Sequence, residues 1–294
     1  MSLEPSALES VSASDRPQFS LNARGRLLLI NEPKVLGILN VTPDSFYPGS
    51  RVQQQSTLLE RAGAMLEAGA WMLDVGGQST RPGSERVSAE EELERVMPAI
   101  ASIRSAFPEA LISIDTFYAK VAQAAVEAGA VLVNDVSAGS IDEELISTVA
   151  GLRVPYVLMH RRGNPQTMQS LAQYDDVLTE VFDDLARRKV ELHAAGIHDV
   201  IIDPGFGFAK TAEHNFQLLR HLSLFHQLRS PLLVGLSRKA TVYRTLGVSA
   251  AEALNGSTVL HTIALQKGAQ LLRVHDVREA REAIRLCAAV DSAQ

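Results

Sequence analysis

The sequence predicts a single α/β domain folded as a (β/α)8 barrel, the TIM barrel, preceded by a short hairpin. Eight short apolar runs recur along the chain, each ends in a polar residue, and each is followed by a stretch with helical periodicity. Several runs are almost continuously apolar, as expected for parallel strands covered on both faces. Eight such units in roughly 260 residues match the usual size of this barrel. A doubly wound open sheet is the structural alternative.

Composition limits the class of protein. The 294 residues carry 28 Lys and Arg against 34 Asp and Glu, a net charge of −6, and 46% of them are hydrophobic. No apolar stretch reaches the ~18 residues that would span a membrane, and the N-terminus lacks a signal-peptide pattern, so we expect a cytoplasmic protein. The mild acidity, without a block of Lys and Arg, argues against nucleic-acid binding. The one cysteine, Cys287, is expected to be a buried core thiol.

The N-terminal region precedes the barrel pattern. Residues 1–17 are rich in serine and poor in apolar side chains, which predicts a flexible, disordered extension. Phe19–Leu21 and Leu27–Ile30 then flank Asn22–Gly25, a pattern typical of a short hairpin. The barrel domain is expected to cover residues 18–290.

The eight apolar runs are spaced so that a helix fits between neighbours. They are Val35–Asn40, Trp71–Asp74, Leu111–Asp115, Val131–Asn134, Pro155–His160, Val200–Asp203, Pro231–Ser237 and Leu271–His275. In a barrel of this kind the carboxyl ends of the strands form one rim, where catalytic groups lie. The polar residues that end these runs are therefore expected to lie together.

Six polar residues at or just after the strand ends should converge on this rim. They are Asp115, Asn134, Asp203, Lys239, Arg273 and His275. Any one of them has an ordinary explanation, since Asp and Asn favour turns. As a set they predict a ligand site, because unpaired charges gathered at one mouth need a partner.

The residue types indicate what the ligand is. Asp115, Asn134 and Asp203 offer hydrogen-bond acceptors and one amide, which suits a planar heterocycle rich in N–H groups. The cations Lys239, Arg273, His275 and Arg81, the last in the turn Ser79–Gly83, suit a phosphate or pyrophosphate. Asn40 adds a hard oxygen compatible with magnesium. The residues alone therefore predict a barrel that binds a polar heterocycle and a phosphorylated group.

Other site types are not indicated. The sequence has no P-loop, no dinucleotide-binding glycine motif, no H-E-x-x-H and no Cys/His zinc spacing. The acidic run Glu90–Glu94 follows Ser88 and is interpreted as the solvated first turn of a helix, where the helix dipole favours negative charge.

Five motifs, in order along the chain, resemble the dihydropteroate synthase family. They are Gly37–Phe46, Ser79–Gly83, Asp203–Phe208, Ser237–Lys239 and Arg273–Asp276. The resemblance implies a magnesium-assisted transferase of folate biosynthesis that condenses 6-hydroxymethyl-7,8-dihydropterin diphosphate with para-aminobenzoate, giving 7,8-dihydropteroate and pyrophosphate. It also implies inhibition by sulfonamides and a homodimer formed through the C-terminal barrel helices.

The resemblance further implies a role for each matching residue. The pterin ring would bind among Asp115, Asn134, Asp203 and Lys239, with Met159 and Phe208 as apolar walls. The diphosphate would be held by Arg273 and His275, with magnesium at Asn40. Thr80 and Arg81 would come from a mobile second loop, and Phe46, on the first loop, would help enclose para-aminobenzoate. Lys239, Arg273 and His275 would carry the catalysis.

Three positions depart from the common family pattern. Pro48 stands where Asp is common, Gln78 where Glu is usual and Ala240 where Ser often follows the lysine. These changes are expected to affect the para-aminobenzoate side more than the chemistry. Two alternatives remain. Related pterin-binding methyltransferase barrels also hold a folate ring with Asp and Asn at strand ends, and Pro48 and Gln78 leave room for a pterin-binding paralogue without synthase activity.

Overall fold

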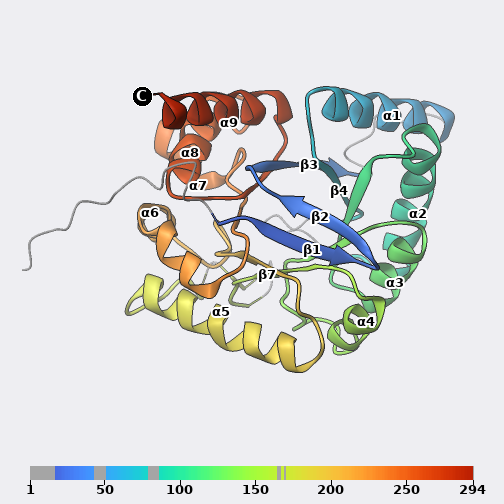
Figure 1. The fold of residues 1–294 in the computed structure, drawn as a ribbon, viewed down its shortest axis with the longest axis horizontal. Helices are drawn as coiled ribbons and strands as arrows, with labels where there is room; N and C mark the ends of the chain where they lie inside the picture. Colours follow the sequence, from blue (N-terminus) through green and yellow to red (C-terminus); the bar gives the residue numbers. More distant parts are fainter. Residues whose placement is uncertain (1–16, 43–50, 79–85, 164–166, 169, 294) are drawn as a thin grey trace, which may run out of the picture.

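The computed structural model describes residues 17–42, 51–78, 86–163, 167–168 and 170–293. Most of the expected N-terminal extension, residues 1–16, lies outside these ranges. The described part is a sheet of eight parallel strands surrounded by helices (Figure 1). The strands are β3 (Lys34–Asn40), β4 (Met72–Gly76), β5 (Leu111–Asp115), β6 (Leu132–Asp135), β7 (Tyr156–Met159), β8 (Val200–Asp203), β9 (Leu233–Val234) and β10 (Leu271–Val274).

The sheet curls into a nearly closed barrel. Its strand order is β8-β7-β6-β5-β4-β3-β10-β9, and a parallel bridge between Ile202 and Leu232 brings the two outer strands together. The predicted barrel is therefore confirmed, and the open-sheet alternative is wrong. The run Pro231–Ser237 forms only a two-residue strand, because the chain leaves the sheet after Val234 and turns at Ser237 and Arg238.

Helices cover the outside of the barrel. They are α1 (Arg51–Glu67), α2 (Ala89–Ala106), α3 (Ala119–Glu127), α4 (Leu145–Leu152), α5 (Val177–Ala194), α6 (Ala212–Arg220), α7 (Ala240–Leu246), α8 (Leu254–Gln266) and α9 (Val277–Ser292), with a 3₁₀ helix at Leu222–Leu228. Their apolar faces pack on the outward side chains of the strands, which forms the larger core. Cys287 lies on α9 and is buried, as predicted.

The predicted hairpin closes the amino end of the barrel. Strands β1 (Phe19–Ala23) and β2 (Arg26–Ile30) pair antiparallel and cross in front of the barrel strands in Figure 1. Arg24 and Gly25 both have positive φ, 55° and 90°, as a tight two-residue turn between twisted strands requires. Alternate side chains, among them Leu21, Leu28 and Ile30, pack on the first residues of the barrel strands. The opposite end, where the carboxyl ends of the strands meet, carries the predicted site, and we call it the mouth.

None of the described helices combines the length and the apolar character needed to cross a membrane.

Candidate active site

A buried ion-pair network occupies the centre of the mouth. Arg273, on β10, donates from Nε to Asp74 Oδ2 at 2.6 Å and from Nη2 to Asp115 Oδ2 at 2.5 Å. Asn134, on β6, donates from Nδ2 to the same Asp74 oxygen at 2.9 Å. Four strands thus meet through side chains that point into the barrel: Asp74 lies in the middle of β4, while Asp115, Asn134 and Arg273 lie at or next to the ends of their strands.

The network corrects one expectation from the sequence. Arg273 is not an unpaired cation waiting for a ligand, since two carboxylates already contact it. Burial alone would lower the pKa of Arg273, but Asp74 and Asp115 raise it above its ordinary value. Its side chain remains 18% exposed, so it still reaches the mouth.

Two carboxylates, those of Asp74 and Asp115, share the single guanidinium of Arg273. Burial raises the pKa of Asp115 to about 7, against the lowering effect of Arg273 and with a further increase from Asp74. Asp115 is therefore poised to gain or lose a proton near neutral pH, which is common in functional sites.

Asp203 and Lys239 form the second group of the mouth. Asp203 ends β8, is 7% exposed and accepts a hydrogen bond from the Gly205 N–H at 2.7 Å. Burial raises the pKa of Asp203, while Lys239 acts to lower it. Burial disfavours the charged form of Lys239 as well, which lowers the pKa of this lysine to about 8, and Asp203 opposes that shift.

Apolar side chains flank this pair. Met159 and Phe208, the predicted walls, belong to one small cluster together with Phe117 and Val136. Lys239 Nζ donates to the Phe206 carbonyl and lies 4.5 Å from the centre of the Phe208 ring. The arrangement suits a flat, polar ring placed between apolar faces and bound at its edge.

His275 is held at the end of β10 by Ser237, a residue of the loop between β9 and α7. Its Nδ1 lies 3.1 Å from Ser237 Oγ, and its backbone N–H donates to the same oxygen at 3.1 Å. These contacts fix the His275 ring at the end of β10, the strand that also carries Arg273.

Asn40, the predicted magnesium ligand, ends β3 between β10 and β4. Its side chain is half-buried and makes no hydrogen bond with a described residue. No group of three or more His, Cys, Asp or Glu side chains in the described ranges is arranged to hold a metal ion. One amide oxygen fits Mg²⁺ only as a ligand of an ion that keeps its waters and is bound mainly by phosphate oxygens.

Three predicted site residues, Phe46, Thr80 and Arg81, lie outside the described residues, and so does Pro48.

Sequence reasoning missed Asp74, although the signal was present. Asp74 ends the predicted strand Trp71–Asp74 just as Asp115 ends its own, and it is fully buried. Its Oδ1 has no hydrogen-bond partner among the described residues, so this oxygen is left for a ligand or a water.

The interpretation of Glu90–Glu94 is wrong at one position. Glu90, Glu91 and Glu94 are exposed in the first turns of α2, but Glu92 is fully buried. Its Oε2 accepts hydrogen bonds from Gln78 Nε2 at 2.7 Å and Thr116 Oγ1 at 3.1 Å. The helical spacing from Glu92 to Val96 and Ile100 could have indicated this, because it places all three on the inner face.

A buried lysine behind the mouth was also missed. Lys210 Nζ lies 2.9 Å from His160 Nδ1 and donates to the carbonyls of Gly205 and Phe208, both at 3.0 Å. Burial lowers the pKa of Lys210 to about 7. These contacts fix the loop that follows Asp203.

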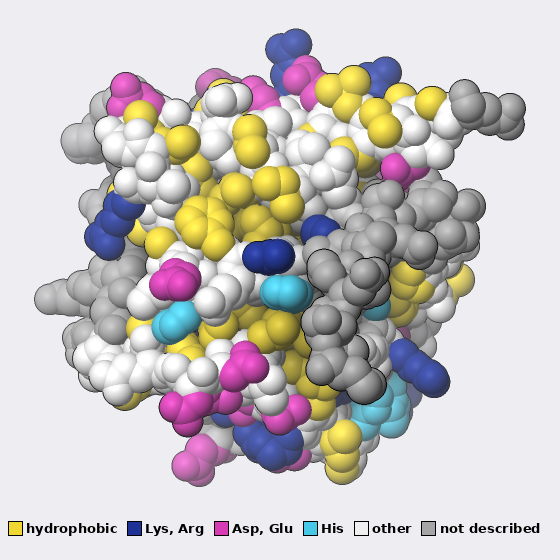
Figure 2. All heavy atoms as spheres, turned by 90° about the vertical axis from the view of Figure 1, so that its left-hand side faces the viewer, with side chains coloured by type: hydrophobic (Ala, Val, Ile, Leu, Met, Phe, Trp, Pro, Cys, Tyr) yellow, Lys and Arg dark blue, Asp and Glu magenta, His cyan; other side chains and the backbone are white. Residues whose placement is uncertain are grey.

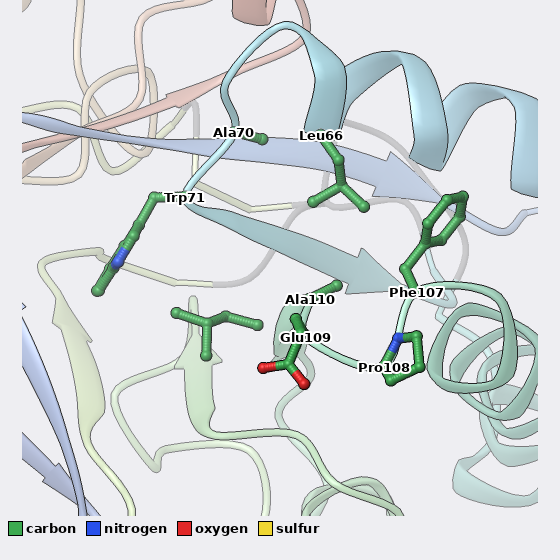
Figure 3. A pocket seen from close by; sticks show the side chains of 8 residues that line it. Leu66, Ala70, Trp71, Phe107, Pro108, Glu109 and Ala110 are labelled. Carbon is green, nitrogen blue, oxygen red and sulfur yellow. The ribbon is translucent and has the colours of Figure 1, made fainter.

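Figure 3 shows an apolar pocket at the other end of the barrel. Its lining residues surround the amino ends of β4 and β5: Leu66, Ala70, Trp71, Phe107, Pro108, Glu109, Ala110 and Leu111. Glu109 is the one charged residue of this lining, which has no counterpart to the paired charges of the mouth, so the mouth remains the candidate active site.

Comparison with known proteins agrees with this geometry. The model of the family described as pterin binding enzyme matches residues 36–275. The dihydropteroate synthase of Escherichia coli (strain K12) is 42% identical over 276 residues, which cover 93% of this chain and 97% of that protein.

Two solved structures are similar throughout. The dihydropteroate synthase of Xanthomonas albilineans with 4-aminobenzoic acid has a TM-score of 0.87 at 41% identity, covering 94% of this chain and 99% of that chain. The Yersinia pestis dihydropteroate synthase in a sulfonamide drug complex has a TM-score of 0.86 at 41% identity, covering 94% and 100%.

Proposed function

The chain belongs to the dihydropteroate synthases of the pterin-binding enzyme family, and we propose that its mouth joins a dihydropterin diphosphate to para-aminobenzoate. Dihydropteroate synthases are transferases that make dihydropteroate for folate synthesis. The observation that supports the proposal best is the convergence of Asp74, Asp115, Asn134 and Arg273 beside the Asp203–Lys239 pair.

The pterin ring would bind at the edge formed by acidic and amide side chains. Asp115, Asn134 and Asp203 present acceptors to its N–H groups, and Lys239, mostly charged below a pKa of about 8, donates to one of its acceptor atoms. Met159 and Phe208 would contact its faces. This placement leaves the methylene diphosphate directed toward β10.

The diphosphate would lie beside Arg273 and His275. Arg273 contributes charge from a fixed position, because Asp74 and Asp115 hold its Nε and Nη2. Asn40, on the adjacent strand β3, would hold Mg²⁺ bound to the phosphate oxygens. That ion would supply further positive charge to the leaving group. Thr80 and Arg81 are proposed to contact the same substrates.

The reaction needs no covalent enzyme intermediate. The bond between the methylene carbon and the diphosphate oxygen breaks with its electron pair leaving on the diphosphate. The amine nitrogen of para-aminobenzoate then bonds to that carbon and loses a proton. Because an aromatic amine is a weak nucleophile, stabilising the leaving diphosphate lowers the barrier most, and hydrogen bonds from Arg273, His275 and Lys239 would serve that end.

Para-aminobenzoate is proposed to bind on the solvent side of the pterin, with Phe46 helping to enclose it. The Xanthomonas albilineans protein binds 4-aminobenzoic acid and the Yersinia pestis protein a sulfonamide drug. We expect sulfonamides to compete with para-aminobenzoate here as well.

A homodimer is proposed for the assembly. Exposed apolar side chains occur on the three adjacent C-terminal helices: Leu246 on α7, Val259 on α8, and Leu286 and Val290 on α9. Figure 2 views the side of the molecule where α6, α7 and α8 lie in Figure 1, and hydrophobic side chains gather in its upper half. Exposed patches of this kind mark interaction surfaces.

A coupled assay of pyrophosphate release tests the activity. Release is expected only when the pterin diphosphate, para-aminobenzoate and Mg²⁺ are all present, and dihydropteroate should appear in equal amount. Pterin binding without release would indicate the non-catalytic paralogue. Methyl transfer from a methylated folate would indicate the methyltransferase barrel instead.

A further inference from the structure

Arg238 has an unusual backbone conformation between two residues of the mouth. Its φ is 52°, in the left-handed region that residues other than glycine rarely adopt. It separates Ser237, which contacts His275, from Lys239, which lies beside Phe208. Strain of this kind persists only where the surroundings hold the residue in place.

The Arg238 side chain supplies that hold. Its Nε and Nη2 donate to the two oxygens of Asp276, each at 2.8 Å, a bidentate pair. Its Nη1 donates to the Ala251 carbonyl at 2.8 Å, and its backbone N–H donates to Ser257 Oγ at 2.9 Å. The β9–α7 loop is thus tied both to the start of α9 and to the turn before α8.

The same two loops meet a second time at the mouth. Ser237 Oγ contacts both the Nδ1 and the backbone N–H of His275, the residue before Asp276. Two consecutive residues of one loop therefore contact two consecutive residues of the other. We call Ser237, Arg238, His275 and Asp276 the clasp.

We propose that Arg238 and Asp276 are positioning residues that fix Lys239 and His275 relative to each other across the mouth. The proposal rests on the function proposed above. Arg238 points away from the mouth to Asp276, so it acts through its neighbours and not on the substrate. The hydrogen bond to Asp276 also raises the pKa of Arg238, so the guanidinium remains charged. A shift of about 1 Å in groups so placed is enough to reduce turnover strongly.

Arg238→Gly tests the proposal, with Arg229→Gly as the matched control. Glycine removes the side chain but suits the left-handed backbone, so the fold should tolerate the change. Arg229 has a φ of 50°, is exposed and lies at the end of the 3₁₀ helix, away from the mouth. Both variants gain backbone freedom, and only one loses the clasp.

In Arg238→Gly, kcat/KM for the pterin diphosphate should fall at least about tenfold, while KM for para-aminobenzoate stays within about twofold. Asp276→Asn, which keeps the shape and loses the charge, should lie between this variant and the wild type. Arg229→Gly should match the wild type. Wild-type kinetics in Arg238→Gly, or a rise in KM for para-aminobenzoate as large as the rise in KM for the pterin diphosphate, would overturn the proposal.

Amide hydrogen exchange gives a second measurement that does not depend on activity. Exchange in residues 274–278 should rise in Arg238→Gly and not in Arg229→Gly, because the clasp is the contact that the substitution removes. Unchanged exchange there would overturn the proposal even if kinetics changed. If the wild type itself shows no synthase activity, the proposed function fails, and the exchange experiment still decides whether the clasp exists.

Discussion

Two carboxylates share one guanidinium at the mouth, and this arrangement determines the net charge and the protonation of the site. Asp74 and Asp115 both accept from Arg273, so the three groups carry one excess negative charge when fully ionised. With a pKa of about 7, Asp115 can be an acceptor only or, once protonated, also a donor. Its protonation state therefore decides which edge of a pterin it can bind.

Asp203 should be the most sensitive residue for pterin affinity. Asp203→Ala would leave pterin N–H groups without acceptors, at roughly 1–3 kcal/mol each, so binding of the pterin diphosphate should weaken at least tenfold. Titration calorimetry measures this directly. Asp199→Ala, just before the other end of the same strand β8, is the control and should bind normally. Unchanged affinity in a folded Asp203→Ala protein would refute the assignment.

Arg273→Lys separates charge from geometry. Lysine keeps the positive charge but lacks the several guanidinium nitrogens of arginine, so it cannot contact Asp74 and Asp115 together. Turnover should fall clearly, and the free energy of unfolding should also fall, because one buried carboxylate loses its partner. The exposed pair Arg278–Glu282 on α9 supplies the control Arg278→Lys. Wild-type turnover in Arg273→Lys would mean that these guanidinium contacts have no part in the reaction.

Glu92 should make stability depend on pH. Burial raises its pKa from 4.5 to about 8, so the folded protein holds a proton that the unfolded chain has lost between these values. The free energy of unfolding should then decrease as pH rises from about 4.5 to about 8. Glu92→Gln should weaken this dependence, whereas Glu94→Gln, exposed on the same helix, should retain it. Identical pH profiles of unfolding for the two variants would contradict the raised pKa.

At the scale of elements, the ends of β5 and β8 could be predicted, and that of β6 to within one residue, because an apolar run and the polar residue that closes it are local features. The partners of Arg273 could not, since Asp74 and Asp115 lie 199 and 158 residues away. Their pairing depends on the order β10-β3-β4-β5 around the barrel. The burial of Glu92 could be predicted only in part. Its helical spacing to Val96 indicates the inner face of the helix, but the acidic residues beside it in the sequence suggest an exposed turn.

The end of β4 is where a departure from the family pattern can be tested. Gln78 donates to the buried carboxylate of Glu92, and Arg95 donates to the Gly77 carbonyl at 2.8 Å. Gln78→Glu would place two carboxyl groups in this contact, so they would have to share a proton. Para-aminobenzoate affinity should change more than pterin affinity.

A four-variant cycle with Pro48→Asp extends this test to the first loop. If the two loops cooperate around para-aminobenzoate, the effects of Gln78→Glu and Pro48→Asp on its dissociation constant should be non-additive. Dissociation constants for both substrates are measured in each variant. Strict additivity, or equal effects on both substrates, would show that the departures are background variation.

At the scale of the whole molecule, the two ends of the barrel are used differently. The hairpin buries Leu21, Leu28 and Ile30 against the amino ends of the strands, so that end is closed by packing. The sequence predicted the hairpin but not the surface that it packs on, since closure depends on the assembled barrel. The outer face of the hairpin leaves Leu27 and Leu29 exposed, 61% and 53%.

The C-terminal helices provide the last prediction, which concerns assembly. Leu246 and Leu286 are 54% and 68% exposed on α7 and α9, and in a twofold dimer each would occur twice in the interface. Leu246→Glu with Leu286→Glu should therefore convert a dimer to monomers in sedimentation equilibrium, because buried carboxylates would lack partners there. The free energy of unfolding of the monomer should hardly change, since both side chains are already exposed. Leu27→Glu with Leu29→Glu makes the same chemical change on the hairpin and should leave the dimer intact. Loss of the dimer in the hairpin variant alone would place the interface at the closed end of the barrel.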